Sequence, residues 1–406
     1  MLLDLLRELT LWILKIASNI QILESRYAIR ERIFGNWEMR GILWMHGASL
    51  GECQVLLELA RRLPQETICM TTQKRAVRDW LVSRIPSNTQ VCIAPLDHPE
   101  VLVRLFTRGK PKALILCENE LWPGWIRACR KLRVPVALVS GRISERGVKR
   151  WKFWAAREFR LMMPGIDPVW VQSADDAQRF VRAGVKSVRL SGDWKWLAVP
   201  DSLFEQRVAS IQEWESRPVD LALISVHREE WPKLGIGLQK LIEFEGACVL
   251  VPRYPEEHKW FEARLRALQI PVVNWPQIKR GSVSMIQQLG LVQQVLTQSR
   301  LALMGGSFCT VTSHNYREPL MQGVPVLVGP YGGHNESELS ALQTEKVVKR
   351  IANLEDLCIG RKGRDCWLSG WFPWEERLKI PAVLLKRKAN AETAYTEFQQ
   401  WLEVIR

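Results

Sequence analysis

The sequence predicts an α/β protein with two Rossmann-like domains that face each other across a cleft, preceded by an amphipathic helix. Three observations lead to this prediction. The chain has 406 residues, which is long for one domain; short apolar runs alternate with longer amphipathic ones; and the alternation restarts after a polar stretch near residue 205. The predicted boundaries are residues 1–25 for the amphipathic helix, 26–204 for the first domain, 205–385 for the second, and 386–406 for a C-terminal helix packing on the first domain.

The first twenty residues, MLLDLLRELTLWILKIASNI, predict a helix that lies in a membrane interface. Its polar residues fall largely on one helical face and its leucines and isoleucines on the other. The charged residues divide it into runs far shorter than the ~20 apolar residues of a spanning helix. Packing against its own domain or a partner is the alternative. Arg26, Arg30 and Arg32 follow and favour contact with anionic lipid.

Composition narrows the class of partner. Lys and Arg number 57 against 43 Asp and Glu, a formal net charge of +14, which suits anionic partners. The sequence lacks an arginine-rich arm, zinc-finger spacing and an RNA-binding aromatic motif, so we predict no nucleic acid partner and favour an anionic membrane surface. The nine cysteines are scattered without a CxxC pair, which indicates a reduced, cytosolic protein without structural zinc.

Each predicted element follows from the same alternation. The predicted strands of the first domain are GILWM, ETICMTT, TQVCIAPL, ALILCE, VPVALVS, PVWVQS and SVRLSG; those of the second are DLALIS, ACVLVPR, IPVVNW, RLALMGG, VPVLVGP and EKVVKRI. Amphipathic stretches such as CQVLLELARRL and KRAVRDWLVSRI predict the intervening helices, and AETAYTEFQQWLEVIR predicts the last one. Ligands bind beyond the carboxyl ends of such strands, so chemistry is expected in the segments that follow them.

Glu52 lies in one of these segments, HGASLGE, where a strand gives way to a helix. A carboxylate in a glycine-flanked turn can be reached by a bulky substrate and can take a proton from a hydroxyl. It can equally cap a helix N-terminus. Glu118, in CENELWPGW, and Lys195, in SGDWK, follow other strands. A hydrogen-bonded structural acid and a solvated surface lysine are the alternatives for these two.

The second domain has anion-binding features after its strands. Arg253, in VPRYPEEH, can pair with a phosphate or carboxylate, and His227, in SVHREE, ends the first strand of this domain, where it can bind phosphate or serve as a cap or core residue. The GGS run at 305–307 brings backbone N–H groups near an anion. Glu318 follows at a helix start, where a carboxylate can accept both hydroxyls of a ribose.

These segments, in this order, resemble the 3-deoxy-D-manno-octulosonic acid (Kdo) transferase family. The resemblance is carried by HGASLGE, ENELWPGW, SGRIS, SGDWK, PRYPEE, GGS and HNYREPLMQGVPVLVGP, and it runs from about Tyr27 to Asn335. HGAS and the KRWKF that follows GRIS resemble the chlamydial type. The resemblance implies a two-domain fold of the GT-B type and an inverting transfer of Kdo from CMP-Kdo to a lipid A precursor, in lipopolysaccharide synthesis. It also implies no metal, no cofactor, and a peripheral or monotopic place on the cytoplasmic face of the bacterial inner membrane.

The resemblance also implies roles for individual residues. Glu52 is then the general base, and Glu118 and Lys195 stabilise the transition state. The residues implied in CMP binding are Pro252, Arg253, Leu289, Gly290, Leu291, Asn315, Tyr316, Arg317 and Glu318; further candidates are Ser49, Gly51, His227, Gly306 and Ser307. Two segments depart from the family pattern. Residues 287–291 read QQLGL in place of Asp-Thr-x-Gly-Glu, and Thr312-Ser313 replace two glycines.

Two other readings remain at this stage. A sugar-nucleotide epimerase of similar double-Rossmann build would use paired carboxylates and a histidine. A non-catalytic relative would keep the fold and bind the membrane surface, and the altered 287–291 segment favours it. The amphipathic N-terminus and the order of the motifs speak against the epimerase. Retention of Glu52, Glu118, Lys195 and Glu318 speaks against the non-catalytic relative.

Overall fold

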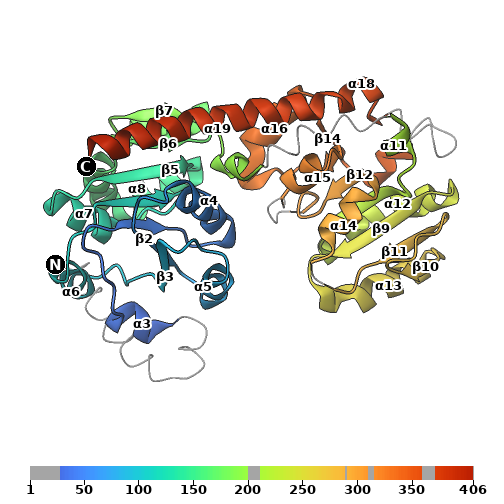
Figure 1. Ribbon diagram of the computed structural model, residues 1–406. Helices are drawn as coiled ribbons and strands as arrows, with labels where there is room; N and C mark the ends of the chain where they lie inside the picture. Colours follow the sequence, from blue (N-terminus) through green and yellow to red (C-terminus); the bar gives the residue numbers. More distant parts are fainter. Residues whose placement is uncertain (1–27, 200–210, 289, 310–314, 359–370, 406) are drawn as a thin grey trace. The chain divides into compact units, whose positions relative to one another are not determined.

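A computed structural model describes residues 28–199, 211–288, 290–309, 315–358 and 371–405. The chain divides into two compact units (Figure 1). The N-terminal unit runs through Ala198 and includes Arg387–Arg406, and the C-terminal unit is Val199–Lys386. The amphipathic helix predicted for residues 1–25 lies outside the described residues.

The N-terminal unit is built on a sheet of seven parallel strands in the order β3-β2-β1-β4-β5-β6-β7. The strands are β1 (Leu43–His46), β2 (Ile68–Thr72), β3 (Thr89–Ile93), β4 (Ala113–Cys117), β5 (Val136–Gly141), β6 (Val169–Val171) and β7 (Val188–Leu190). The predicted parallel sheet is confirmed. From β1 the chain adds β2 and β3 on one side, and it then returns to add β4 on the other side of β1. The switch point of the sheet therefore lies between β1 and β4. Ligands of such sheets bind at this switch point.

Helices precede, connect and follow these strands. They are α3 (Ile29–Phe34), α4 (Leu50–Arg62), α5 (Arg75–Val82), α6 (Pro99–Thr107), α7 (Pro123–Lys131), α8 (Glu145–Met162), α9 (Ala174–Arg182) and the short η2 (Trp194–Ala198). Every residue of β1, β4 and β5 is buried, which explains why their sequences are mostly apolar. The tryptophans contribute to this core: Trp44 and Trp125 are both buried, with ring centroids 4.7 Å apart.

The C-terminal unit repeats this plan with a second sheet of seven parallel strands, in the order β10-β11-β9-β8-β12-β13-β14. The strands are β8 (Val219–Val226), β9 (Ala247–Pro252), β10 (Val272–Asn274), β11 (Ser282–Met285), β12 (Ser299–Met304), β13 (Val326–Val328) and β14 (Val348–Arg350). Its switch point lies between β8 and β12.

Strand β11 was not predicted from the sequence. Its sequence, SVSM, contains two serines and no apolar run, yet the whole strand is buried. The hydroxyl of Ser282 donates to the carbonyl of Lys279 at 2.7 Å, and that of Ser284 donates to the carbonyl of Gln277 at 2.5 Å. Both buried hydroxyls are therefore satisfied, and burial of the strand carries no unmet polar group.

The remaining elements of the C-terminal unit are mostly short. They are α11 (Ile211–Glu215), α12 (Trp231–Glu243), α13 (His258–Ala267), α14 (Val292–Thr297), α15 (Arg317–Met321), α16 (Glu336–Thr344), α18 (Trp374–Arg377) and the first residues of α19 (Lys379–Val404).

The end of α19 packs on the N-terminal unit. The Tyr395 hydroxyl donates to the carbonyl of Arg62 at 2.9 Å, and the Trp170 indole N–H donates to Glu397 at 3.0 Å. Phe398 is buried against the rings of Trp170 and Trp194. Aromatic and polar contacts therefore hold this helix end, as its amphipathic sequence requires.

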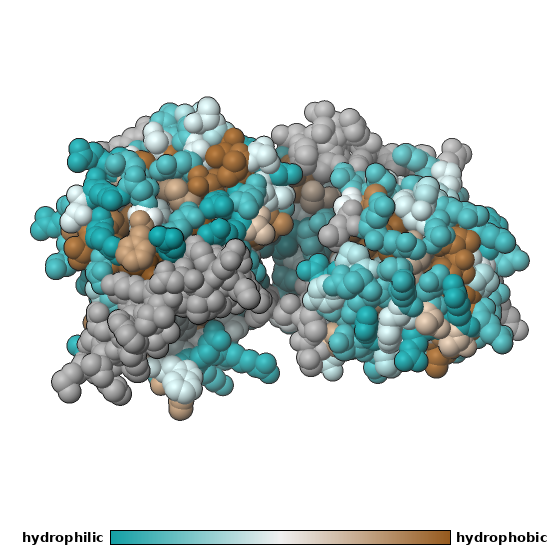
Figure 2. Space-filling model, turned by 90° about the horizontal axis from the view of Figure 1, so that it is seen from below, coloured by the Kyte–Doolittle hydropathy of each residue, from teal (hydrophilic) through white to brown (hydrophobic). Residues whose placement is uncertain are grey.

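The described residues on the face shown in Figure 2 are mostly polar at the surface. On the face shown in Figure 2, hydrophobic groups form small separate areas among hydrophilic ones. Among the described residues, no helix has both the length and the apolar character needed to cross a bilayer.

Candidate active site

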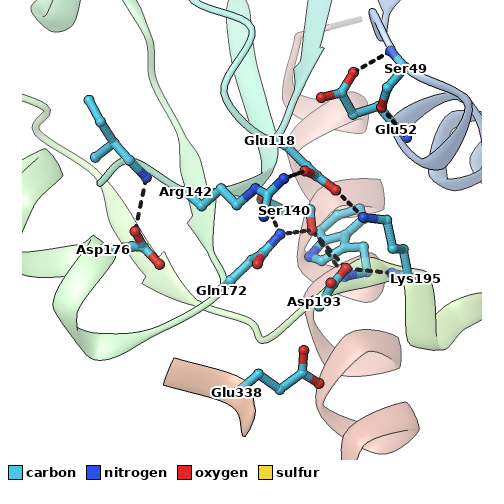
Figure 3. Close-up of polar contacts among 12 residues, drawn as sticks. Ser49, Glu52, Glu118, Ser140, Arg142, Gln172, Asp176, Asp193, Lys195 and Glu338 are labelled. Carbon is cyan, nitrogen blue, oxygen red and sulfur yellow. Dashed lines mark hydrogen bonds and ion pairs between the residues drawn. The ribbon is translucent and has the colours of Figure 1, made fainter. Parts of the chain in front are cut away.

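Glu52 lies at the switch point of the first sheet, in the third position of α4. Ser49 caps this helix. Its hydroxyl accepts a hydrogen bond from the Glu52 backbone N–H at 3.4 Å, and Glu52 Oε2 accepts one from the Ser49 backbone N–H at 2.7 Å (Figure 3). This reciprocal pair is a capping box. The capping geometry considered from the sequence is therefore present, and it fixes the carboxylate in one orientation.

The surroundings of Glu52 raise the pKa of its carboxyl above the usual value for a glutamate. The side chain is 8% exposed. Burial raises the pKa of the Glu52 carboxyl to about 7, and the negative charges of Glu120 and Glu118 add to the rise, while the Ser49 contacts oppose it. A carboxylate with a pKa near neutrality has the proton affinity that a general base needs.

Two glycines in the motif let other atoms approach Glu52. A Cβ added at Gly47 would lie 2.9 Å from the Cβ of Glu52. A Cβ added at Gly51 would lie 3.3 Å from Cε and 3.5 Å from Nζ of Lys195. Glycine at 51 therefore makes room for the ammonium group beside the first turn of α4.

Glu118 follows β4 and is 1% exposed. Its φ of 56° is unusual for a residue with a side chain. Neighbouring β5 enforces it: the Glu118 N–H donates to the carbonyl of Val139 at 3.0 Å, and the Glu118 carbonyl accepts from the N–H of Arg142 at 3.1 Å. The backbone thus holds the carboxylate at the carboxyl edge of the sheet.

Two cations flank the Glu118 carboxylate (Figure 3). Arg142 Nη2 lies 2.6 Å from Oε2, and the Lys195 ammonium donates to Oε1. The structure therefore brings Glu118 and Lys195, both predicted from the sequence, into direct contact, with Glu52 alongside. Arg142 was not selected from the sequence, although it lies in the SGRIS segment. Its contact depends on the fold of β5.

A buried network supports Lys195. The Lys195 backbone N–H donates to Asp193 Oδ1 at 2.9 Å, and the Ser140 hydroxyl donates to the same oxygen at 3.2 Å. The Gln172 amide in turn donates to the Ser140 hydroxyl at 3.1 Å. These contacts fix the short helix η2, so Lys195 is held from β5, β6 and η2 together.

A second buried pair lies beside this cluster. His46, the last residue of β1, contacts Thr71 Oγ1 through Nδ1 at 2.9 Å and Glu120 Oε2 through Nε2 at 3.1 Å. The Trp122 indole N–H also donates to Glu120 Oε2, at 2.9 Å. Burial lowers the pKa of His46, and Glu120 opposes that fall. Sequence reasoning did not select His46 or Glu120. His46 and Trp122 hold the Glu120 carboxylate, whose negative charge adds to the rise in the pKa of Glu52.

The sequence candidates of the C-terminal unit follow neighbouring strands of the second sheet. Arg253 follows β9, His227 follows β8 and Gly306 follows β12, while Gly290 and Leu291 follow β11. Because parallel strands end at the same edge, these candidates share one edge of the sheet. Leu289 lies outside the described residues, as do Thr312 and Ser313.

Two of these candidates have structural contacts. The His227 backbone N–H donates to Glu230 Oε2 at 2.9 Å, and Glu230 Oε1 accepts from the N–H of Phe308 at 2.9 Å. The Ser307 hydroxyl donates to the carbonyl of Met304 at 2.5 Å and accepts from the N–H of Gly329 at 2.7 Å. The Ser307 hydroxyl therefore links the end of β12 to the segment that follows β13.

Glycine is required where β12 ends. A Cβ on Gly305 would lie 2.2 Å from the carbonyl oxygen of Ser225, and Gly306 has a φ of 73°. The two glycines let this turn pass close to β8.

Segment 315–318 separates into two kinds of residue. Tyr316 and Arg317 are buried, and both bond Glu338 of α16, Arg317 at 2.7 Å. Glu318 accepts a hydrogen bond from the Asn315 amide at 3.0 Å and is exposed to solvent, although neighbouring groups partly desolvate its carboxyl and raise its pKa. Glu318 and Asn315 therefore provide the surface groups, and Tyr316 and Arg317 anchor them.

Among the described residues, no group of three or more His, Cys, Asp or Glu side chains could hold a metal ion. Arg253, by contrast, has an exposed side chain, with its guanidinium 5.9 Å from the centre of the Tyr254 ring. At the edge of the second sheet, this exposed guanidinium is suited to pairing with an anion.

Comparison with known proteins identifies the family of this chain. Residues 23–198 match the family model of 3-deoxy-D-manno-octulosonic-acid transferase. A 3-deoxy-D-manno-octulosonic acid transferase from Chlamydia pneumoniae is 30% identical over 309 residues, covering 71% of this chain and 69% of the relative. The chain belongs to the 3-deoxy-D-manno-octulosonic acid transferase family. The family's enzyme from Aquifex aeolicus is 26% identical over 296 residues, covering 72% of this chain and 77% of the relative.

Solved structures agree on the fold of this Kdo transferase family member. A glycosyltransferase from Rickettsia africae has a TM-score of 0.59 at 11% identity, covering 91% of this chain and 99% of that one. A UDP-GlcNAc 2-epimerase from Neisseria meningitidis has a TM-score of 0.53 at 16% identity, covering 88% of this chain and 98% of that one. The predicted GT-B-type fold is confirmed. Since transferases and epimerases share it, the relationship by sequence is what separates the two readings.

Proposed function

We propose that the protein is an inverting glycosyltransferase that moves Kdo from CMP-Kdo to a lipid A precursor in lipopolysaccharide synthesis. The observation that carries this is the carboxylate pair at the first switch point, in a chain of this family. Glu52 has a pKa raised to about 7, and beside it Glu118 is held between Arg142 and Lys195.

In the proposed reaction, an acceptor hydroxyl attacks the anomeric carbon of Kdo. Glu52 takes the hydroxyl proton as the new C–O bond forms. The bond from the anomeric carbon to the phosphate oxygen breaks, and CMP leaves with the bonding electrons. A single displacement of this kind inverts the anomeric configuration and needs one base opposite the leaving group.

The capping box gives Glu52 its direction for this step. Oε2 is occupied by the Ser49 N–H, and Oε1 takes no hydrogen bond from the part of the chain that the structure describes. Oε1 is then the oxygen that receives the proton. Lys195 and Arg142, both held in place by Glu118, supply positive charge that offsets the negative charge developing on CMP as it departs.

We assign CMP to the edge of the second sheet. Arg253 would pair with the phosphate, the turn at Gly306 would present backbone N–H groups, and Glu318 would accept the ribose hydroxyls. Gly290 has a φ of 88° and open space around it, so the 290–291 backbone can contact the nucleotide without the family's acidic side chains.

We further propose that residues 1–25 bind the anionic cytoplasmic face of the bacterial inner membrane, so that the protein is peripheral or monotopic there. The formal net charge of +14 supports this, since it attracts both the bilayer and the phosphates of the acceptor. No metal or cofactor enters the proposal.

The test is direct. Purified protein is incubated with CMP-Kdo and a tetraacylated lipid A precursor, and added sugars are counted by mass spectrometry. Kdo-bearing product together with released CMP is the expected result. Failure to form product while Glu52 is intact would favour the non-catalytic relative, and an epimerised nucleotide sugar would favour the epimerase.

A further inference from the structure

Helix α8 carries an exposed aromatic pair that the proposed reaction does not use. Phe153 is 79% exposed and Trp154 is 76% exposed, and their rings are in edge-to-face contact with centroids 5.1 Å apart. The next most exposed aromatic residue in the described part of the chain is Phe34, at 54%. Single exposed apolar residues are ordinary, but contiguous exposed apolar groups often mark an interaction site, and these two large rings adjoin each other in solvent.

The packing of α8 explains why the pair faces outward. The helix buries Val148, Phe159 and Met162, and Trp151 stacks on Phe159 with ring centroids 5.9 Å apart. These residues define the inner face. Regular helical geometry is interrupted at Ala155, where φ is −149° and ψ is 45°, immediately after the aromatic pair. The inner face thus anchors both halves of the helix and leaves the pair on the outside.

The same helix is strongly basic. Six cations are exposed on it: Arg146, Lys149, Arg150, Lys152, Arg157 and Arg160. None of the six forms an ion pair with a described residue. The two acids of α8 are matched by neighbouring helices, Glu158 by Arg127 at 3.0 Å and Glu145 by Arg179 at 3.7 Å. The positive charge of α8 therefore remains uncompensated at the surface.

Aromatic side chains surrounded by uncompensated Lys and Arg match one partner well. At an anionic bilayer, Trp and Phe rings sit at the headgroup level, and basic side chains extend their charged ends to lipid phosphates. Nucleic acid would also meet the charge. We favour lipid because the sequence has no arginine-rich arm, zinc-finger spacing or RNA-binding aromatic motif.

We propose that α8 is a membrane-docking surface, distinct from residues 1–25, in which Phe153 and Trp154 insert into an anionic bilayer among the basic side chains of the helix. The surface begins three residues after Arg142, which contacts Glu118. Docking there would hold the active site of the N-terminal unit close to a lipid-embedded acceptor. The proposal concerns binding, so it does not depend on the transferase reaction.

The test uses the full chain and vesicles of phosphatidylcholine with or without phosphatidylglycerol, with sedimentation as the readout. Phe153→Ser/Trp154→Ser should weaken partitioning into anionic vesicles roughly ten-fold or more. Trp154→Phe should retain most of it, because an aromatic ring remains. The matched control is Val181→Ser/Leu190→Ser, which removes two exposed apolar residues elsewhere on the N-terminal unit and should bind like the wild type.

A second set of variants tests the charge. Lys149→Gln/Arg150→Gln/Lys152→Gln should weaken binding to anionic vesicles by roughly ten-fold or more, and 0.5 M salt should remove most of the difference from the wild type. Lys233→Gln/Lys279→Gln/Arg280→Gln removes the same number of exposed charges from the C-terminal unit and should have little effect.

Two results would overturn the proposal. One is wild-type partitioning by the Phe153→Ser/Trp154→Ser variant, whatever its folding or activity. The other is binding of the wild type to single-stranded nucleic acid, lost in these variants, without binding to either kind of vesicle. Circular dichroism of each variant shows whether the helix is retained, and Trp154→Phe separates loss of the aromatic surface from damage to the fold.

Discussion

Replacing Glu52 by Gln should increase stability while abolishing most activity. Glutamine keeps an oxygen that can accept the Ser49 N–H, so the capping box survives. What it removes is the buried charge. The rise in the pKa of Glu52 from 4.5 to about 7 means that ionising this carboxyl costs the folded protein about 3 kcal/mol, at about 1.4 kcal/mol for each pKa unit.

The sign of this effect depends on pH. A carboxyl whose folded pKa is raised binds its proton more tightly in the folded state, so stability falls as pH rises from about 4.5 to about 7 and is level above that. The glutamine variant lacks this fall. Its advantage over the wild type should be about 1 kcal/mol at pH 5 and about 3 kcal/mol at pH 8. Calorimetric unfolding of the full chain at the two pH values measures the difference.

Asp176→Asn is the matched control, since Asp176 is also the third residue of a capped helix, α9 (Figure 3). Its carboxylate is paired with Arg179 at 3.2 Å and accepts from the N–H of Ile143 at 2.9 Å. Its charge is therefore compensated, and the amide should lower stability. Activity should change little, because no contact joins Asp176 to Glu118 or Lys195 within the described residues.

The activity of the Glu52→Gln variant should fall by roughly 10²–10⁴ if Glu52 is the base. The wild-type kcat/KM should decrease below about pH 7, where the carboxyl takes up its proton. Activity within a few fold of the wild type would remove Glu52 from the chemistry. If the variant is no more stable than the wild type at pH 8, then ionised Glu52 does not destabilise the folded protein, and the reasoning is refuted.

Four other outcomes are expected. Glu318→Ala should weaken CMP binding roughly ten-fold or more in titration calorimetry, since a charge-assisted hydrogen bond contributes about 1.5–3 kcal/mol; unchanged affinity would place the ribose elsewhere. EDTA should leave activity intact, and its abolition by the chelator would contradict a metal-free reaction. Arg142→Gln should lower kcat but not CMP affinity, because it removes the 2.6 Å contact to Glu118 and leaves the second unit unchanged; weakened CMP binding would refute that separation. Deleting residues 1–20 should weaken vesicle binding and lower activity on lipid-embedded acceptor more than on detergent-dispersed acceptor; equal binding would make that segment structural.

Much of the fold could be predicted because buried parallel strands have a simple signature. The uninterrupted apolar sequences of β4 and β9 follow from burial on both faces. Strand β11 could not be predicted in this way because it buries two serines. Their hydroxyls donate to carbonyls of the preceding loop, and only the folded structure brings these groups together. Apolar periodicity detects buried side chains, and it misses buried polar ones whose partners lie elsewhere in the chain.

In the candidate site, too, some residues could be predicted from the sequence and others depend on contacts that only the fold creates. Glu52, Glu118 and Lys195 could be selected because each follows a predicted strand in a segment that resembles the family, but the sequence offered no reason to join Arg142 to Glu118. That contact depends on the backbone of Glu118, which β5 holds in the left-handed region through hydrogen bonds to Val139 and Arg142. A hydrogen-bond register between two strands leaves no trace in the spacing of residues along the chain.

The two readings of Glu52, base and helix cap, prove compatible in the structure. The contact from the Ser49 N–H stabilises the charged form and so works against the rise in pKa, yet burial and the charges of Glu118 and Glu120 outweigh it. The same contact fixes Oε2 and leaves Oε1 as the oxygen able to accept a proton. A glutamate at this position without a cap would have more freedom to rotate and to reach Lys195. In the reaction we propose, capping would keep the carboxylate oriented for proton transfer, and burial would give it the proton affinity that this transfer requires.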